Sequence, residues 1–207
     1  HPNTILLSDE SLIDTYSSYH PSSLVITTNT IIKQVCNVQS TNGVCATFMY
    51  PHNESLLYSD AYDEQSAFNK FKSCRRVVVI NRLSDPGNLG TILRTAYSFG
   101  YDAVVVFENT ISPFNDKVVK GSRTVLFQIP LIFCSKEKFI QWVQLINEVK
   151  CVVSTCETRI DGNQVHLLDN KTNISDLQKS AKLCIMVNSE HEGNEIEFAL
   201  PGVDQFQ

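Results

Sequence analysis

The sequence predicts an α/β protein whose larger part is built around a parallel β-sheet. Three observations support this: a length of 207 residues, short apolar runs that alternate with helical patterns from residue 76 onward, and one strand–turn–helix segment within that region. Strands and helices alternating at about 25-residue spacing are typical of βαβ units, in which consecutive strands run parallel. A chain of this length can form one large domain or two small ones.

Residues 1–52 are expected to form a small α/β domain of their own. Ser8 or Asp9 is suited to begin a helix that runs to residue 18, and Thr28 or Asn29 a second helix that runs to residue 38, because such side chains cap helix N-termini. Short apolar runs predict strands at residues 5–7, 24–26 and 43–48.

Residues 53–73 are polar and lightly patterned, and we interpret them as a linker that ends in a short helix at residues 64–72. Residues 74–207 then form the larger domain. Its expected strands are residues 77–81, 103–107, 126–129, 151–155 and 183–187. Its expected helices are residues 89–99, 116–121, 136–149 and 174–180.

The most informative segment of the chain reads DPGNLGTILRTAYSFG and follows the apolar run VVVI. Pro86 and Gly87 are expected to make the turn, Asn88 to cap the helix and Gly100 to end it. Arg94 points away from the apolar face, which is formed by Leu89, Ile92, Leu93, Ala96 and Phe99. A strand followed by a glycine-bearing turn and free helical N–H groups can receive an anion or a cofactor.

The charge distribution limits where a nucleic acid could bind. The net charge is −5, and residues 1–60 hold one lysine against five carboxylates. Affinity for phosphates depends on lysine and arginine, so any RNA-binding surface should lie on the C-terminal domain. No apolar run reaches the length of about 18 residues that a membrane-spanning helix needs.

The cysteines indicate an intracellular protein. All seven are scattered and none forms a C-x-x-C pair, which is typical of reduced, mostly buried thiols and gives no zinc-binding spacing. We therefore expect no bound metal. The first residues match neither a signal peptide nor a transit peptide. Because the sequence does not begin with Met, we expect upstream sequence in which a targeting segment could lie, so cytoplasm and organelle (mitochondrion or plastid) both remain open.

The strand–turn–helix segment resembles motif 1 of the SpoU (TrmH) family of RNA ribose 2′-O-methyltransferases, in the SPOUT superfamily. The family pattern N-x-G-x-x-x-R-T-A places its functional asparagine and arginine at Asn88 and Arg94. The resemblance implies an α/β-knot catalytic domain. It also implies that residues 1–52, which include VITTNTIIKQVCNVQSTNGVCATF, correspond to the family's small N-terminal substrate-binding domain.

A second segment, LCIMVNSEHEGNE, resembles motif 2 of the same family and aligns Glu190 with its glutamate. The resemblance implies a catalytic role for Glu190. Asn188 and His191 replace two family glycines, and asparagine is the residue that best tolerates a positive φ after glycine. The resemblance also implies S-adenosylmethionine as cofactor, bound by Thr155, Val187, Asn188, Ser189 and Gly193.

A third stretch, KVVKGSRTVLFQIP, resembles a family segment with Ser122 and Pro130 in register and Thr124 in place of a glycine. Three basic residues of this stretch recur at i, i+3 and i+6, so we expect them on one helical face, where they could contact RNA phosphates. These residues are Lys117, Lys120 and Arg123. The family's motif 3, around S-L-N-x-x-x-A, does not occur before the sequence stops at Gln207.

The resemblance implies a homodimeric enzyme that transfers a methyl group from S-adenosylmethionine to a ribose 2′-OH of tRNA or rRNA. The charge of Arg94 suits it to hold a phosphate and the nascent alkoxide. Asn88 would orient Arg94 or the backbone turn, and Glu190 would fix Arg94 or the motif 2 loop. The alternative is a catalytically inactive RNA-binding or ribosome-assembly relative of the same fold, which the substitutions at Thr124, Asn188 and His191 favour. A Rossmann oxidoreductase is disfavoured because the turn lacks G-x-G-x-x-G.

Overall fold

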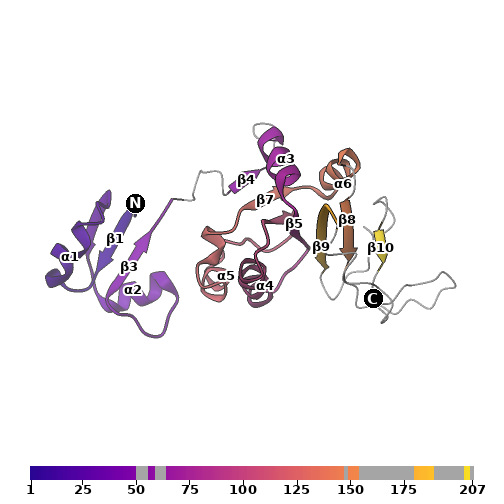
Figure 1. Cartoon of the computed structure of the whole chain (residues 1–207). Coiled ribbons are helices and arrows are strands. Elements are labelled where there is room, and N and C mark those ends of the chain that lie inside the picture. The colour runs from indigo at the N-terminus through magenta and orange to yellow at the C-terminus, as the bar shows by residue number, and fades with distance from the viewer. Residues whose placement is uncertain (50–55, 59–63, 147–148, 154–179, 189–202, 206–207) are drawn as a thin grey trace. The chain divides into compact units, whose positions relative to one another are not determined.

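The computed structural model describes residues 1–49, 56–58, 64–146, 149–153, 180–188 and 203–205 (Figure 1). The chain divides into two compact units, His1–Pro51 and His52–Gln207, and each has its own sheet. Among the described residues, no helix has both the length and the apolar character needed to cross a bilayer. The described cysteines are all free thiols, as predicted, and four of them are buried.

The first unit contains a three-stranded sheet in the order β2-β1-β3. The central strand β1 (Thr4–Leu7) runs parallel to β2 (Ser23–Ile26) and antiparallel to β3 (Val44–Thr47). All three predicted strands are confirmed. The small core of the unit is formed by the fully or almost fully buried side chains of Ile5, Leu7 and Ile32.

The helices of the first unit begin where the sequence predicts. Asp9 accepts a hydrogen bond from the Ser11 N–H at 2.8 Å, and Thr28 accepts one from the Ile31 N–H at 3.3 Å. The helical segments are η1 (Glu10–Leu12), α1 (Ile13–Ser17) and α2 (Asn29–Cys36). The second predicted helix ends two residues early because Asn37 adopts a left-handed conformation with φ of 48°.

The second unit is an α/β fold built on a seven-stranded sheet in the order β10-β8-β9-β5-β6-β7-β4. All neighbouring strands in it are parallel, which confirms the predicted fold class. The strands are β4 (Leu56–Tyr58), β5 (Arg76–Asn81), β6 (Ala103–Phe107), β7 (Leu131–Cys134), β8 (Val149–Val153), β9 (Lys182–Asn188) and β10 (Val203–Gln205). The helices are α3 (Glu64–Ser73), α4 (Pro86–Ser98), α5 (Asp116–Gly121), η2 (Val125–Phe127) and α6 (Lys136–Leu145).

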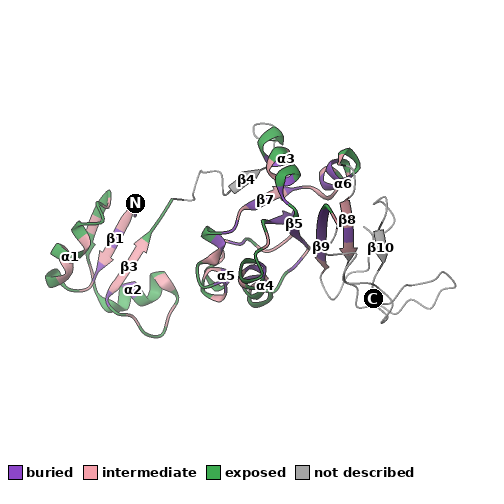
Figure 2. Ribbon diagram, viewed as in Figure 1, coloured by how far each residue is buried: buried purple, intermediate pink, exposed green. Residues whose placement is uncertain are grey.

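Helices cover both faces of this sheet, and the core is therefore double (Figure 2). Val77 and Val79 of β5 pack with side chains of α3 and α6, whereas Val78 and Ile80 pack with α4, α5 and η2. This alternation follows from the two-residue side-chain period of a strand. Trp142 on α6 is 2% exposed and stacks on Phe71 at 5.6 Å between ring centroids, so it is part of the core.

The predicted strand at residues 126–129 is wrong. Residues 125–127 form the 3₁₀-helix η2, and the next strand is β7, five residues later than predicted. The chain turns at Thr124, which has φ of 65°, and Leu126 and Ile129 are then buried in the cluster beneath α4. Their three-residue spacing therefore reflects a helical turn and not an extended strand.

The interpretation of residues 53–73 as a linker is corrected. Within this segment β4 pairs with β7, and α3, whose predicted helix is confirmed, buries Ala67 and Phe71 completely. These side chains lie one helical turn apart and pack into the core with α6. The segment consequently contributes to the second unit, although its composition is polar.

Two predicted helices differ from the structure or lie outside it. Helix α6 ends at Leu145 and not at residue 149, because Val149 already begins β8. The predicted helix at residues 174–180 lies outside the described residues except for Ser180, which is not helical.

Candidate active site at the carboxyl edge of the sheet

The turn between β5 and α4 is capped differently from the prediction. Asp85, not Asn88, is the N-cap residue, and its Oδ1 accepts the Asn88 N–H at 2.7 Å. Pro86 occupies the first helical position, where its fixed φ and missing N–H are favourable, so the helix begins earlier than predicted. The Asn88 side chain is exposed and forms no hydrogen bond with a described residue. The Asn88 side chain therefore does not cap the helix.

The end of α4 is closed as predicted by Gly100, which has φ of 71°. The Gly100 N–H bonds to the Tyr97 carbonyl and the Tyr101 N–H to the Ala96 carbonyl, both at 3.0 Å, which is the Schellman pattern. Phe99 does not join the apolar face of the helix, contrary to the prediction. It follows the last helical residue and is 76% exposed.

Gly90 in motif 1 allows two helices to touch. A Cβ atom at this position would lie 2.9 Å from the Gly121 carbonyl carbon and from the Ser122 backbone nitrogen. Ser122 is fully buried, and its hydroxyl donates to the Val119 carbonyl at 3.1 Å. The glycine of motif 1 and the serine of the third family segment thus serve one close contact between α4 and α5.

Arg94 lies on the same side of α4 as this contact. Gly90, Arg94 and Tyr97 are spaced i, i+4 and i+7, so they form one stripe along the helix. At one end of the stripe Gly90 meets Ser122, and at the other the Tyr97 hydroxyl lies 2.7 Å from the Gln128 Oε1. Arg94 is half-buried and forms no ion pair with any described residue, so its charge remains available to a ligand.

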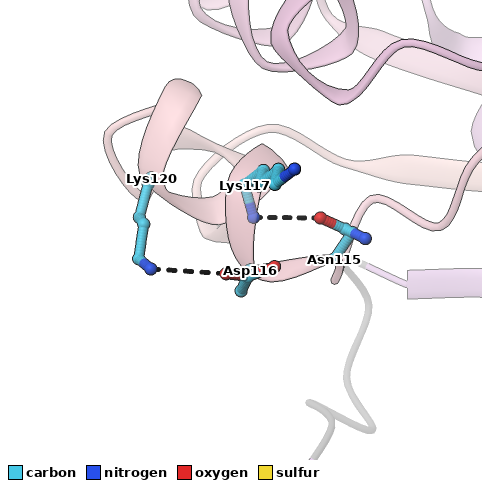
Figure 3. A network of polar contacts seen from close by, with 4 residues as sticks. All are labelled: Asn115, Asp116, Lys117 and Lys120. Atoms are coloured by element: carbon cyan, nitrogen blue, oxygen red, sulfur yellow. Dashed lines mark hydrogen bonds and ion pairs between the residues drawn. The ribbon is translucent and has the colours of Figure 1, made fainter. Parts of the chain in front are cut away.

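The three basic residues of the third segment do not share one helical face. Helix α5 ends at Gly121, and Arg123 follows it with φ of 51°, so the predicted helical spacing breaks there. Lys120 forms an exposed ion pair with Asp116 at 3.3 Å. Lys117 extends away from that pair (Figure 3). All three side chains are exposed, but they form a loose group and not a stripe.

Asn81, the last residue of β5, was not predicted from the sequence as a site residue. Its Nδ2 donates to the Asn188 Oδ1 at 3.0 Å, directly across the parallel pair β5–β9. Asn188 is an extended residue at the end of β9 and is not among the residues with positive φ. Conformational tolerance therefore does not explain asparagine here. The amide instead joins the end of the motif 2 strand to the strand that carries motif 1.

The ends of β5 and β9 form a topological switch point. The chain leaves β5 through α4 to β6 on one side, whereas the strand that follows β9, β10, lies on the other side beyond β8. In open parallel sheets, ligands bind at the carboxyl ends of the strands where the connections diverge. We call this end of the seven-stranded sheet the carboxyl edge. Motif 1 and the start of motif 2 both lie on it.

Several predicted site residues lie outside the described part of the chain. Val187 and Asn188, the last residues of β9, are half-buried at the carboxyl edge. The remaining predicted residues follow β8 or β9 in the sequence, and nothing in the described structure tests them: Thr155, Ser189, Glu190 and Gly193. Within the described ranges, no group of three or more potential metal ligands occurs.

Comparison with known proteins identifies the family. The model of the SpoU rRNA methylase family matches residues 75–199, which contain the switch point and most of the second unit. The chain belongs to this family. The resemblance of motifs 1 and 2 is thereby confirmed as common descent of the second unit, and the family fold agrees with the parallel sheet described above.

Curated relatives include three RNA methyltransferases. The chain is 28% identical over 126 residues to the 23S rRNA (guanosine(2553)-2′-O)-methyltransferase RlmP of Bacillus subtilis, covering 60% of this chain and 45% of the relative. It is 31% identical over 117 residues to a TrmH family tRNA/rRNA methyltransferase of Staphylococcus epidermidis (56% and 42%). Mouse mitochondrial rRNA methyltransferase 3 is 26% identical over 106 residues (51% and 22%). The chain thus spans less than half the length of these relatives.

Solved structures of the family share the fold. An rRNA methyltransferase from Sinorhizobium meliloti aligns with the whole chain and 71% of its own length, with a TM-score of 0.69 and 18% identity. The SpoU methyltransferase AviRb from Streptomyces viridochromogenes, in complex with AdoMet, aligns with the whole chain and 73% of its own length, with a TM-score of 0.65 and 14% identity.

Proposed function

We propose that the protein transfers the methyl group of S-adenosylmethionine to a ribose 2′-OH of rRNA or tRNA. The observation that supports this most directly is the position of motif 1 at the switch point, where the side chains of Asn88 and Arg94 form no hydrogen bond or ion pair with described residues. The similarity to rRNA and tRNA methyltransferases of Bacillus subtilis and Staphylococcus epidermidis also favours this activity.

The cofactor would bind at the ends of β8 and β9. The neutral amide of Asn188, its partner Asn81 on the neighbouring strand β5, and the strand-end backbone groups suit the uncharged adenosine part of S-adenosylmethionine. When bound, this cofactor supplies an electrophilic methyl group on a sulfonium. We assign its binding to Val187 and Asn188 and, on the sequence alone, to Thr155, Ser189 and Gly193.

Methyl transfer depends mainly on how the ribose hydroxyl and the methyl group are positioned. The ribose oxygen forms a bond to the methyl carbon, the carbon–sulfur bond breaks with its electron pair staying on sulfur, and the hydroxyl proton leaves to water. Holding the reactants in line supplies most of the rate. Arg94 would stabilise the negative charge that develops on the oxygen and hold the adjacent phosphate. Asn88 would orient the turn before α4, and Glu190 would fix the position of Arg94.

The RNA would approach the side of the sheet that carries α4 and α5. Arg94, Lys117, Lys120 and Arg123 lie on these two helices and the residues that follow α5, and phosphate contacts of this kind position an RNA. We further propose a homodimer, since members of the superfamily complete their sites by dimerisation, and a location inside the cell, in the cytoplasm or an organelle.

The test is methyl transfer by the full-length gene product from methyl-tritiated S-adenosylmethionine to deproteinised total RNA. The RNA is then digested to nucleosides that are separated by chromatography. We expect a labelled 2′-O-methylnucleoside from wild type and Arg75→Ala, and a loss of at least about 100-fold in Arg94→Ala. Arg75 is an exposed arginine at the opposite edge of the sheet. RNA binding without any 2′-O-methyl product would support the inactive relative instead.

A further inference from the structure

A cavity separate from the switch point opens at the carboxyl ends of β6 and β7. It has a volume of about 460 Å³ and is open to solvent. We call it the β6–β7 pocket, and its walls include Phe107, Glu108, Asn109, Phe114, Phe133 and Ser135. The volume lies within the range of about 300–1,000 Å³ usual for small-molecule sites.

We propose that this pocket receives the base of the nucleotide whose ribose is methylated. The inference rests on the proposed function and names a part of the substrate site that motifs 1 and 2 do not. Sequence-specific recognition of RNA targets unpaired bases, which stack on aromatic side chains and bond through their edges.

The pocket is tied to the motif 1 turn by hydrogen bonds. The Ile111 N–H donates to the Leu83 carbonyl at 2.8 Å, and the Thr110 hydroxyl lies 3.5 Å from the Ile80 carbonyl at the end of β5. The loop that walls the pocket is therefore attached to the segment that leads into Asn88. A base in the pocket would bring its own ribose towards this turn.

The strand order places the pocket on the side of motif 1 that faces away from motif 2. Across the sheet the order is β9-β5-β6-β7, so the motif 1 turn after β5 lies between the end of β9 and the pocket. Methyl transfer requires the attacking oxygen and the leaving sulfur on opposite sides of the methyl carbon. A cofactor at the end of β9 and a nucleoside at the ends of β6 and β7 satisfy that requirement.

The walls suit a base better than a phosphate. Phe114 and Phe133 provide aromatic surface, and Phe114 is held by a tilted contact with Phe127 at 6.4 Å between ring centroids. No lysine or arginine is among the lining residues that the structure describes, and Glu108 would repel an anion. The Glu108 carboxylate and the Asn109 amide can instead bond the polar edge of a base. A nucleotide base offers both features, a flat stacking face and polar groups along its edge.

Photo-crosslinking tests the proposal without requiring methyl transfer. The probes are two pools of random single-stranded 12-nucleotide RNAs, one containing 4-thiouridine and one containing 6-thioguanosine, irradiated with the full-length protein and mapped by mass spectrometry. We expect crosslinks on peptides that contain residues 106–114 and 133–135. Glu108→Trp, which fills the pocket, should lower their yield at least about fivefold, as expected for the loss of one base–aromatic stack.

The control is Glu137→Trp, because Glu137 is also exposed but does not line the pocket. The wild-type crosslink map needs no variant, so a failure of Glu108→Trp to fold leaves the test intact. Crosslinks that avoid the pocket peptides, or a yield unaffected by Glu108→Trp in a folded protein, would overturn the proposal. Pocket crosslinks in a protein without methyl transfer would instead count against the proposed function alone.

Discussion

The two edges of the seven-stranded sheet use their polar groups differently. At the amino edge, where the strands begin, the polar groups hold the fold together. The buried Lys182 ammonium donates to the Phe71 and Cys74 carbonyls at the end of α3. The Asp102 carboxylate accepts the N–H groups of Arg75 and Arg76 at 2.7 and 2.8 Å.

At the carboxyl edge, several polar groups remain available to ligands. Asn88 and Arg94 form no side-chain bonds with described residues, and the β6–β7 pocket is open to solvent. Parallel sheets separate stability and ligand binding in this way because helix N-termini and divergent connections collect at the carboxyl ends of the strands. Substitutions at the amino edge should therefore change stability, and most substitutions at the carboxyl edge should change activity.

The largest expected effect is at Arg94. Arg94→Ala should lower kcat/KM for methyl transfer about 100- to 1,000-fold, equivalent to about 2.7–4 kcal/mol of transition-state stabilisation. The melting temperature should stay within about 2 °C of wild type, because the side chain bonds no described residue. Kinetics and a thermal melt on the same preparation check both. A large fall in melting temperature would show that Arg94 stabilises the fold, which contradicts the division of roles between the two edges.

Gly90 is an exception among the residues of motif 1, because a substitution there should change stability. Gly90→Val should destabilise the protein by about 3 kcal/mol, since its side chain would overlap the α5 backbone that already lies 2.9 Å from an added Cβ. Denaturant unfolding measures this change. The matched variant Thr91→Val is at an exposed position of the same helix and should change the stability by less than about 0.5 kcal/mol. Equal effects at both positions would refute the close contact.

A substitution of Lys182 tests whether the amino edge serves stability and not activity. Lys182→Met should lower the free energy of unfolding by about 2 kcal/mol, because two buried carbonyls lose their donor. The methyl-transfer rate per folded molecule should be unchanged. If fully folded Lys182→Met transferred methyl groups more slowly than wild type, the amino edge would have a role in catalysis, contrary to the account.

Wild type and Lys182→Met should also differ in how their free energy of unfolding depends on pH. Burial lowers the pKa of the Lys182 ammonium below its usual 10.5. The unfolded state then binds more protons in the alkaline range below 10.5, so the stability of wild type relative to Lys182→Met should rise with pH there and level off above it. A relative stability that falls over this range would contradict the burial of a charged lysine.

The smallest effect is expected at Thr124. This β-branched residue adopts φ of 65°, where the family has glycine, and such a conformation costs roughly 1–2 kcal/mol for a residue with a Cβ. Thr124→Gly should stabilise the protein by about 1 kcal/mol, after allowing for the greater entropy of glycine in the unfolded chain. Gly100→Ala, at the corresponding turn after α4, should change the stability by a similar amount in the opposite sense.

Local signals explain most of the fold that could be predicted. The β5–α4 unit carries a cap, a proline at N1, an apolar face and a terminal glycine, and its extent was predicted to within three residues at its start. Two capping side chains, Asp85 and Asn88, compete there, and the choice depends on the preference of Pro86 for the first helical position. Residues 126–129 could not be assigned, because their burial under α4 is a tertiary effect.

The candidate site was predictable only where a motif records it. Asn88, Arg94 and Asn188 were found through the family pattern. Asn81 was not, because its partner Asn188 lies 107 residues away and the contact depends on the register of β5 against β9. The β6–β7 pocket is likewise assembled from two strand ends and a loop, and no local spacing marks it.

The most direct test of the carboxyl-edge account is calorimetric titration of S-adenosylhomocysteine into the full-length wild type and three variants. We predict similar dissociation constants, of about 1–100 μM, for wild type, Arg94→Ala and Lys182→Met, because Arg94 serves the RNA and Lys182 the fold. Asn188→Trp, at the other end of the same strand β9, should weaken binding at least about tenfold. No binding by wild type, or tight binding by Asn188→Trp, would contradict the account.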